Sequence, residues 1–164
     1  MVPLPWIVED ETKSLLWADF DNDGDDDLFV MEVSGRCGFV ENDGNGGFDL
    51  TMDSDGAGQG PTQLPQAETY AGGASFGDMD GDGDLDLHIC RYVELPNFAE
   101  DGLRNVLLRN DGNFSFTDVS QASGIDEYMR LSFQSAWWDY NEDGLQDVLV
   151  INDKGGANSV FKNQ

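Results

Sequence analysis

The feature that most constrains this chain is an acidic nine-residue segment that occurs three times, at residues 19–27, 78–86 and 139–147. The stretches LLWADFDNDGDDDLFVME, ASFGDMDGDGDLDLHICR and SAWWDYNEDGLQDVLVIN align without gaps, and their first acidic positions are 59 and 61 residues apart. Similarity at a regular spacing is typical of proteins built from stacked copies of one structural unit. We therefore expect a repeat protein in which every unit carries one acidic loop.

The segments that flank the acidic loops have the character of β-strands. After the loops come Leu28–Met31, Leu87–Cys90 and Val148–Ile151, which are short, apolar and bounded by turn residues. Further on, Asp43-Gly44 and Asp111-Gly112 are suited to tight hairpins. Helical periodicity is nearly absent, so we predict an all-β chain of four-stranded antiparallel blades, the units of a β-propeller.

The expected blade boundaries are residues 12–52, 69–120 and 131–164. The third blade lacks a fourth strand after Ser159-Val160-Phe161. Closed propellers have about four to eight blades, whereas this chain has about two and three-quarters. We therefore expect either an excerpt of a longer propeller or a fragment that assembles through open blade edges. One hypothesis is that Val2–Glu9 supplies the missing strand to the third blade of another copy.

The loops have the composition of a calcium site. Calcium takes six to eight oxygen ligands in flexible geometry, and acids at alternate positions of a short loop can surround it. Positions 1, 3, 5 and 9 would contribute side chains, and position 7 its backbone carbonyl, because Leu145 has no side-chain oxygen. Position 6 is glycine each time, and position 8 (Asp26, Leu85, Gln146) should point away from the ion. The expected ligands are Asp19, Asp21, Asp23, Asp25 and Asp27, then Asp78, Asp80, Asp82, Asp84 and Asp86, then Asp139, Asn141, Asp143, Leu145 and Asp147.

Two other interpretations of the loops fit less well. An EF-hand needs a glutamate at position 12 and an exiting helix, whereas these loops have Val30, Ile89 and Val150 there, each in a predicted strand. Magnesium prefers rigid octahedral geometry with several waters. A single acidic turn is often solvated without metal, but three in register predict three calcium sites.

Charge and composition exclude several classes of partner. The chain has 33 acidic and 8 basic residues, a formal net charge of −25, and 15 of the acids lie in the 27 loop residues. Such a surface repels nucleic acid and anionic lipid, and no apolar run is long enough to span a membrane. The N-terminus does not resemble a signal peptide, so a secreted form would carry its signal outside this chain. Cys37 and Cys90 are either two buried thiols or a disulfide.

The loops, together with Asn105–Val119 and Ala122–Ile125, resemble the FG-GAP/VCBS repeat family, the repeats of integrin-α-type propellers. The resemblance implies calcium-bound blades, an extracellular setting, and a role in adhesion or ligand binding rather than catalysis. There are too few blades for a closed ring. The insert at 53–68 also departs from the pattern, and its Asp53 and Asp55 leave open a further cation site.

Two functions are therefore expected. The first is a structural, adhesive or ligand-binding module whose partner is a protein or a glycan. The alternative is a carbohydrate-binding or polysaccharide-active propeller, for which Trp138 and Tyr140 would form a stacking surface. His88 should be a packed residue. The large apolar residues beside the loops are expected to form the core between blades: Trp17, Phe76 and Trp137 before them, and Phe20, Met79 and Tyr140 within them.

Overall fold

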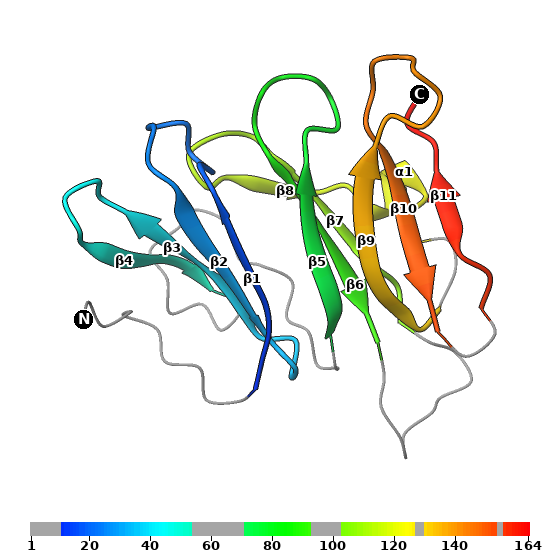
Figure 1. Cartoon of the computed structure of the whole chain (residues 1–164), viewed down its shortest axis with the longest axis horizontal. Helices are drawn as coiled ribbons and strands as arrows, with labels where there is room; N and C mark the ends of the chain where they lie inside the picture. The colour runs from blue at the N-terminus through cyan, green and yellow to red at the C-terminus, as the bar shows by residue number, and fades with distance from the viewer. Residues whose placement is uncertain (1–10, 54–70, 93–102, 127–129, 154–155) are drawn as a thin grey trace.

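The computed structural model describes residues 11–53, 71–92, 103–126, 130–153 and 156–164. In this part of the chain the backbone forms three antiparallel sheets and one four-residue helix (Figure 1). The prediction of an all-β chain is therefore confirmed. Val2–Glu9 and Asp55 lie outside the described residues, as does the side chain of Asp53. None of the described helices has the length and apolar character needed to cross a membrane.

Each sheet is a meander in which strands adjacent in sequence pair with each other. The first consists of β1 (Thr12–Ala18), β2 (Asp27–Glu32), β3 (Cys37–Asn42) and β4 (Phe48–Asp53). The second consists of β5 (Ala71–Gly77), β6 (Asp86–Arg91), β7 (Val106–Asn110) and β8 (Phe116–Asp118), followed by the helix α1 (Ser120–Ser123). The third has β9 (Ser132–Trp138), β10 (Asp147–Asn152) and β11 (Ser159–Phe161).

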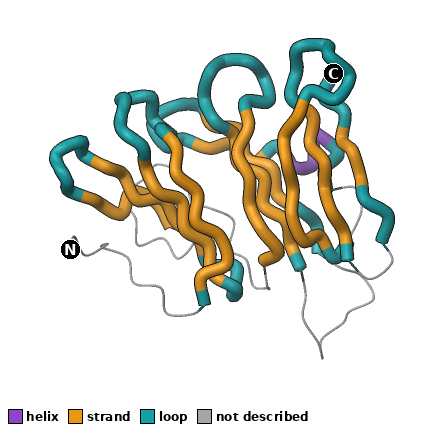
Figure 2. The backbone as a smooth tube through the Cα atoms, viewed as in Figure 1, coloured by secondary structure: helices purple, strands orange, loops and turns teal. Residues whose placement is uncertain are grey.

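The three sheets lie side by side in chain order, and the acidic loops are all at the same end of them (Figures 1 and 2). The register is the same in each sheet, because the residue before the loop pairs with its last aspartate: Ala18 with Asp27, Gly77 with Asp86 and Trp138 with Asp147. A residue of one sheet therefore has a structural equivalent in the other two.

Apolar side chains fill the two interfaces between the sheets. We call the interface of the first and second sheets the first joint, and that of the second and third sheets the second joint. The first joint holds an aromatic cluster in which Phe39 stacks on Phe116 with ring centroids 5.0 Å apart. The second joint holds aliphatic side chains such as Leu107 and Val148, together with Cys90. Cys37 and Cys90 are buried thiols and not a disulfide.

The expectation that the large residues beside the loops form the core is confirmed for four of the six. Phe20 and Phe76 pack in the first joint, and Met79 and Trp137 in the second. The expectation is wrong for Trp17 and Tyr140, which are 56% and 44% exposed. Trp17 lies on the side of the first sheet that faces away from the second, and Tyr140 belongs to the third sheet at the other end of the stack. His88 is packed, as predicted, and fully buried.

Candidate metal centre

The loop backbone reverses direction through two left-handed residues. Gly24, Gly83 and Gly144 at position 6 have φ between 91° and 98°, a region that glycine enters without steric cost. Position 4 is also left-handed, with φ of 63° at Asn22 and 60° at Glu142. The sequence indicated the turn at position 6 but not the one at position 4, where glycine occurs only in the second loop.

The last aspartate of each loop is buried and holds the loop to its own sheet. Asp27, Asp86 and Asp147 are 0%, 0% and 2% exposed. One carboxylate oxygen accepts the N–H of the residue at position 2, at 3.0, 2.6 and 3.1 Å in the three loops. The other oxygen accepts a backbone N–H from an asparagine at or just beyond the end of the third strand, at 2.9, 2.8 and 2.8 Å. Those asparagines are Asn42, Asn110 and Asn163.

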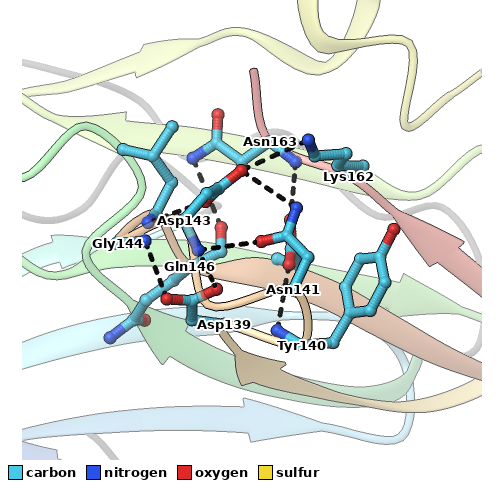
Figure 3. A network of polar contacts seen from close by, with 10 residues as sticks. Asp139, Tyr140, Asn141, Asp143, Gly144, Gln146, Lys162 and Asn163 are labelled. Carbon is cyan, nitrogen blue, oxygen red and sulfur yellow. Dashed lines mark hydrogen bonds and ion pairs between the residues drawn. The ribbon is translucent and has the colours of Figure 1, made fainter.

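The first aspartate turns inward toward the loop backbone. Asp139 accepts the N–H groups of Asp143 at 3.1 Å and Gly144 at 2.8 Å (Figure 3). Asp19 is bonded in the same way by the equivalent residues of the first loop. The loop thus holds this carboxylate at its centre, beside the buried aspartate at position 9.

Positions 1, 3 and 9 converge in the first two loops. Carboxylate oxygens of Asp19, Asp21 and Asp27 lie within 4.8 Å of one another, and so do those of Asp78, Asp80 and Asp86. Negative groups at that separation repel one another strongly unless a cation lies among them. Hard divalent cations prefer carboxylate oxygens of this kind, so each of these two sets can hold a metal ion.

The pKa values record the electrostatic cost of this arrangement in the metal-free chain. Burial raises the pKa of Asp27 and of Asp86 to about 6, against the opposing effect of their N–H donors. Burial, together with neighbouring acids, also raises the pKa of Asp21 and Asp80. A cation at the centre would lower these pKa values, because it favours the charged carboxylates.

Positions 5 and 7 are placed differently. The position 5 carboxylates of Asp23, Asp82 and Asp143 accept the N–H of position 7. In the first two loops the position 7 side chain lies against the hairpin of its own sheet, Asp25 beside Gly44 and Asp84 beside Gly112. Asp84 also accepts the side-chain amide of Asn22 in the first loop. The expected role of position 7 as a backbone ligand therefore does not require its side chain. That positions 5 and 7 bind an ion stays a prediction.

The third loop does not repeat the arrangement of three carboxylates, because position 3 is the amide Asn141. Its side-chain N–H donates to Asp143 at 2.9 Å, and Lys162 forms an ion pair with the same carboxylate at 3.2 Å (Figure 3). The N–H of Leu145, Asn141 and Lys162 hold the pKa of Asp143 below its usual value. The third loop thus has one negative charge fewer at its centre and a lysine against its rim.

Sequence reasoning missed the asparagines that follow the third strands. Besides holding position 9, the side-chain amide of Asn110 donates to the carbonyl of Phe20 at 3.0 Å, and that of Asn163 donates to the carbonyl of Met79. In both cases the asparagine of one sheet bonds position 2 of the loop in the preceding sheet. The sequence held a partial signal, since Asn42 and Asn110 both stand directly before the Asp-Gly of a predicted hairpin.

A cavity of about 410 Å³ opens between the second and third sheets. It is lined by apolar side chains such as Ile125 and Phe161 and by the indole of Trp137. The Trp137 Nε1–H is buried without a hydrogen-bond partner among the described residues. The cavity therefore combines apolar side chains with polar ones such as Gln146 and Asn163.

Comparison with known proteins matches the first two loops to a repeat family. The family model of FG-GAP-like repeats matches residues 19–89, a segment shorter than half of the chain that runs from the first acidic loop to the strand after the second. No curated protein matches the sequence. Residues 19–89 are thus similar to an FG-GAP-like repeat, and for this segment the predicted resemblance to the FG-GAP/VCBS family is confirmed.

Proposed function

We propose that the chain is a calcium-binding β-propeller repeat module with a structural, adhesive or ligand-binding role outside the cell. The observation that carries the proposal is the convergence of positions 1, 3 and 9 in the first two loops. The third loop is proposed as a further site of lower affinity, because it has an amide at position 3 and Lys162 against position 5. Each sheet would then be one propeller blade, with the ion fixing the loop that joins its first two strands.

An extracellular setting follows from the same chemistry. Calcium affinity depends on the number of charged ligands and the rigidity of the loop, and weak sites are used where calcium is abundant. FG-GAP-like repeats are also typical of extracellular proteins, as the resemblance implies. In calcium-rich fluid the ions would offset the repulsion within each acidic set.

The test is calorimetric calcium titration of chelator-treated protein, with magnesium as the control ion and thermal melts alongside. We expect two tighter sites and one weaker site, and a rise in melting temperature, since a ligand that binds only the folded state stabilises it by mass action. No calcium binding, or an unchanged melting temperature, would refute the proposal.

Single substitutions assign the sites. Asp21→Asn copies the amide found at Asn141 and should weaken one tight site about tenfold or more, a change of at least about 1.4 kcal/mol. Asn141→Asp should strengthen the third site instead. Asp49→Asn, on an exposed position of β4, removes the same charge outside the loops and should leave all three affinities unchanged.

A carbohydrate-binding role is the second candidate, and the exposed aromatic residues favour it. Trp138 is 67% exposed and Tyr140 is also exposed, so both can stack on a sugar ring. The acids whose pKa is raised, Asp21, Asp27, Asp80 and Asp86, all belong to the proposed metal sites, so we propose binding without cleavage. Glycan-array binding that Trp138→Ala removes would support this role, and an array without binding would count against it.

A further inference from the structure

The two ends of the stack of sheets carry most of the exposed apolar side chains. Seven large hydrophobic residues of the described chain are exposed, and six of them lie on two faces. Leu15 and Trp17 are on the side of the first sheet that faces away from the second, which we call the first outer face. Trp138, Tyr140, Ile151 and Val160 are on the opposite end, on the third sheet, which we call the third outer face.

The first outer face is equivalent to surfaces that are covered elsewhere in the chain. Trp17 pairs with Leu28, which pairs with Val40, so the three side chains share this face. The residues equivalent to Trp17 are Phe76, which packs in the first joint, and Trp137, which packs in the second. The second and third sheets therefore use this face to contact the sheet that precedes them.

The third outer face is equivalent to surfaces that contact the following sheet. Tyr140 corresponds to Phe20, packed in the first joint, and to Met79, packed in the second. Leu149 pairs with both Ala136 and Val160, so this face continues across all three strands. The third outer face is therefore the kind of surface against which the first outer face would pack.

We propose that a second copy of this chain covers both faces, with the first outer face of each copy packed on the third outer face of the other. Contacts of this head-to-tail kind form a ring when the rotation closes. Two copies would give six sheets, within the range of closed propellers. The inference rests on the packing of the sheets and does not depend on calcium binding.

Contacts in the two joints within the chain predict the equivalent contacts in the proposed joint between two copies. In the second joint the hydroxyl oxygens of Ser75 and Ser135 are 2.7 Å apart, and the equivalent pair between copies is Ala136 with Leu15. Asn110 and Asn163 each donate to position 2 of the preceding loop. By the same rule the amide of Asn42, which in its own sheet donates to Asp26 at 3.0 Å, faces the carbonyl of Tyr140 in the second copy.

One equivalent contact is unfavourable and gives the joint a characteristic salt dependence. In the first joint the amide of Asn22 donates to the Asp84 carboxylate. The equivalent residues between copies are Glu142 and Asp25, two carboxylates, which repel each other. Exposed charges are screened by salt, so the two copies should associate more tightly as ionic strength rises.

The first test is the mass of the chain in solution, measured by light scattering over a range of concentrations at moderate salt. We expect twice the mass of one chain, and tighter association at higher salt. A monomer at all concentrations would overturn the proposal, and so would open polymers without a two-copy species.

Two charge substitutions on exposed positions identify the faces. Trp17→Glu and Val160→Glu should each give a monomer, while an equimolar mixture of the two should again give a dimer, because one unmodified joint can form between them. Phe133→Glu is the matched control, since Phe133 is 49% exposed but outside both faces, and should stay dimeric. Thermal melts check that each variant is folded. A mixture that stays monomeric would contradict a head-to-tail joint.

Cross-linking then tests the register. Leu15→Cys and Ala136→Cys are prepared as separate proteins, mixed and oxidised, and the products are separated without reductant. A covalent pair of chains should form in the mixture and in neither variant alone. Dimers that show no covalent pair in the mixture would mean that another surface is used, which would overturn the proposal.

Discussion

The two joints of this molecule have the same strand register but different chemistry. In the first joint Phe29 of the first sheet faces the side of the second sheet that carries Ala74, within a cluster of phenylalanines. In the second joint the equivalent residues are His88 and Ser135, whose Nδ1 and Oγ are 2.7 Å apart. The comparison shows that the repeat specifies the sheet and its loop. The interface between sheets can be formed by either aromatic or polar side chains.

The polar side chains in the second joint should make it contribute less to the stability of the fold than the first joint does. Ser135 is also 2.7 Å from Ser75, but the buried Nε2 of His88 has no hydrogen-bond partner among the described residues. A buried polar network stabilises a core only when its members are satisfied. Burial lowers the pKa of His88 to about 3, so the imidazole is neutral. A cavity of about 410 Å³ also opens at this joint.

The largest expected difference comes from truncating one equivalent residue in each joint. Phe39 is fully buried and contacts the rings of five other phenylalanines. Phe39→Ala should cost about 3–5 kcal/mol of the free energy of unfolding, and Leu107→Ala, its counterpart in the second joint, nearer the lower end of about 2–5 kcal/mol. Urea denaturation measures both. An equal or larger loss from Leu107→Ala would reverse the ranking of the joints.

Gly77→Ala should break the second joint selectively. A Cβ at Gly77 would collide with the ring of Trp137, whereas the equivalent residue in the first joint is already Ala18. Overpacking of this kind costs about 1–3 kcal/mol. The thermal melt gives the loss, and a change in tryptophan fluorescence would locate it at Trp137. Ala18→Gly is the control, with a loss of only about 0.5–1 kcal/mol from strand flexibility.

A double-mutant cycle can convert the second joint toward the first. Ser135→Ala leaves the buried Nδ1 of His88 with only the weak Cys90 thiol contact at 3.8 Å, at a cost of about 1–3 kcal/mol. Adding His88→Phe recreates the pair Phe29 and Ala74 of the first joint and should recover most of that loss, because replacing both polar partners by apolar groups is close to neutral. If the double variant is less stable than Ser135→Ala alone, the joints are not interchangeable.

The smallest effect is a pH dependence confined to the second joint. The pKa of His88 is about 3 in the folded chain and 6.5 ordinarily, so the unfolded chain takes up the proton first. The contribution of His88 is therefore complete above the ordinary pKa and is lost as pH falls toward about 3. Between about pH 7 and about pH 6 the loss is under about 1 kcal/mol.

The acidic loops oppose this trend in metal-free protein. Asp27 and Asp86 have a folded pKa of about 6, above the ordinary 3.8, so their protonation favours the folded state as pH falls through about 6. Both aspartates contribute equally to the pH dependence of the wild-type protein and of His88→Phe, so the difference between the two proteins reports His88 alone. Chemical denaturation should show a smaller loss on acidification in the variant, and parallel curves would mean that His88 does not titrate in this way.

Local pattern was enough to predict the strands, the loops and the all-β class. Alternate acids around a glycine specify a turn, and a short apolar segment such as Leu28–Met31 specifies a strand wherever it occurs. The core positions beside the loops were predicted in part, but the chemistry of each joint was not, because the neighbours that decide it are about 60 residues away in the sequence. His88 and Phe29 occupy the same strand position, and only the residue across the joint distinguishes their surroundings. For the same reason nothing in the repeat indicated that Trp17 would be uncovered.

The asparagines that hold the loops have a thermodynamic consequence. Asn110 bonds Asp86 of the second loop through its backbone N–H and the carbonyl of Phe20 in the first loop through its side chain. One residue therefore contacts both loops. If each loop binds an ion as proposed, an ion that reshapes one loop would change the free energy of binding at the other. Such coupling is reciprocal, so each ion must alter the affinity of the other by the same factor. With ions bound as proposed, the three sheets would behave as a linear array of linked binding equilibria.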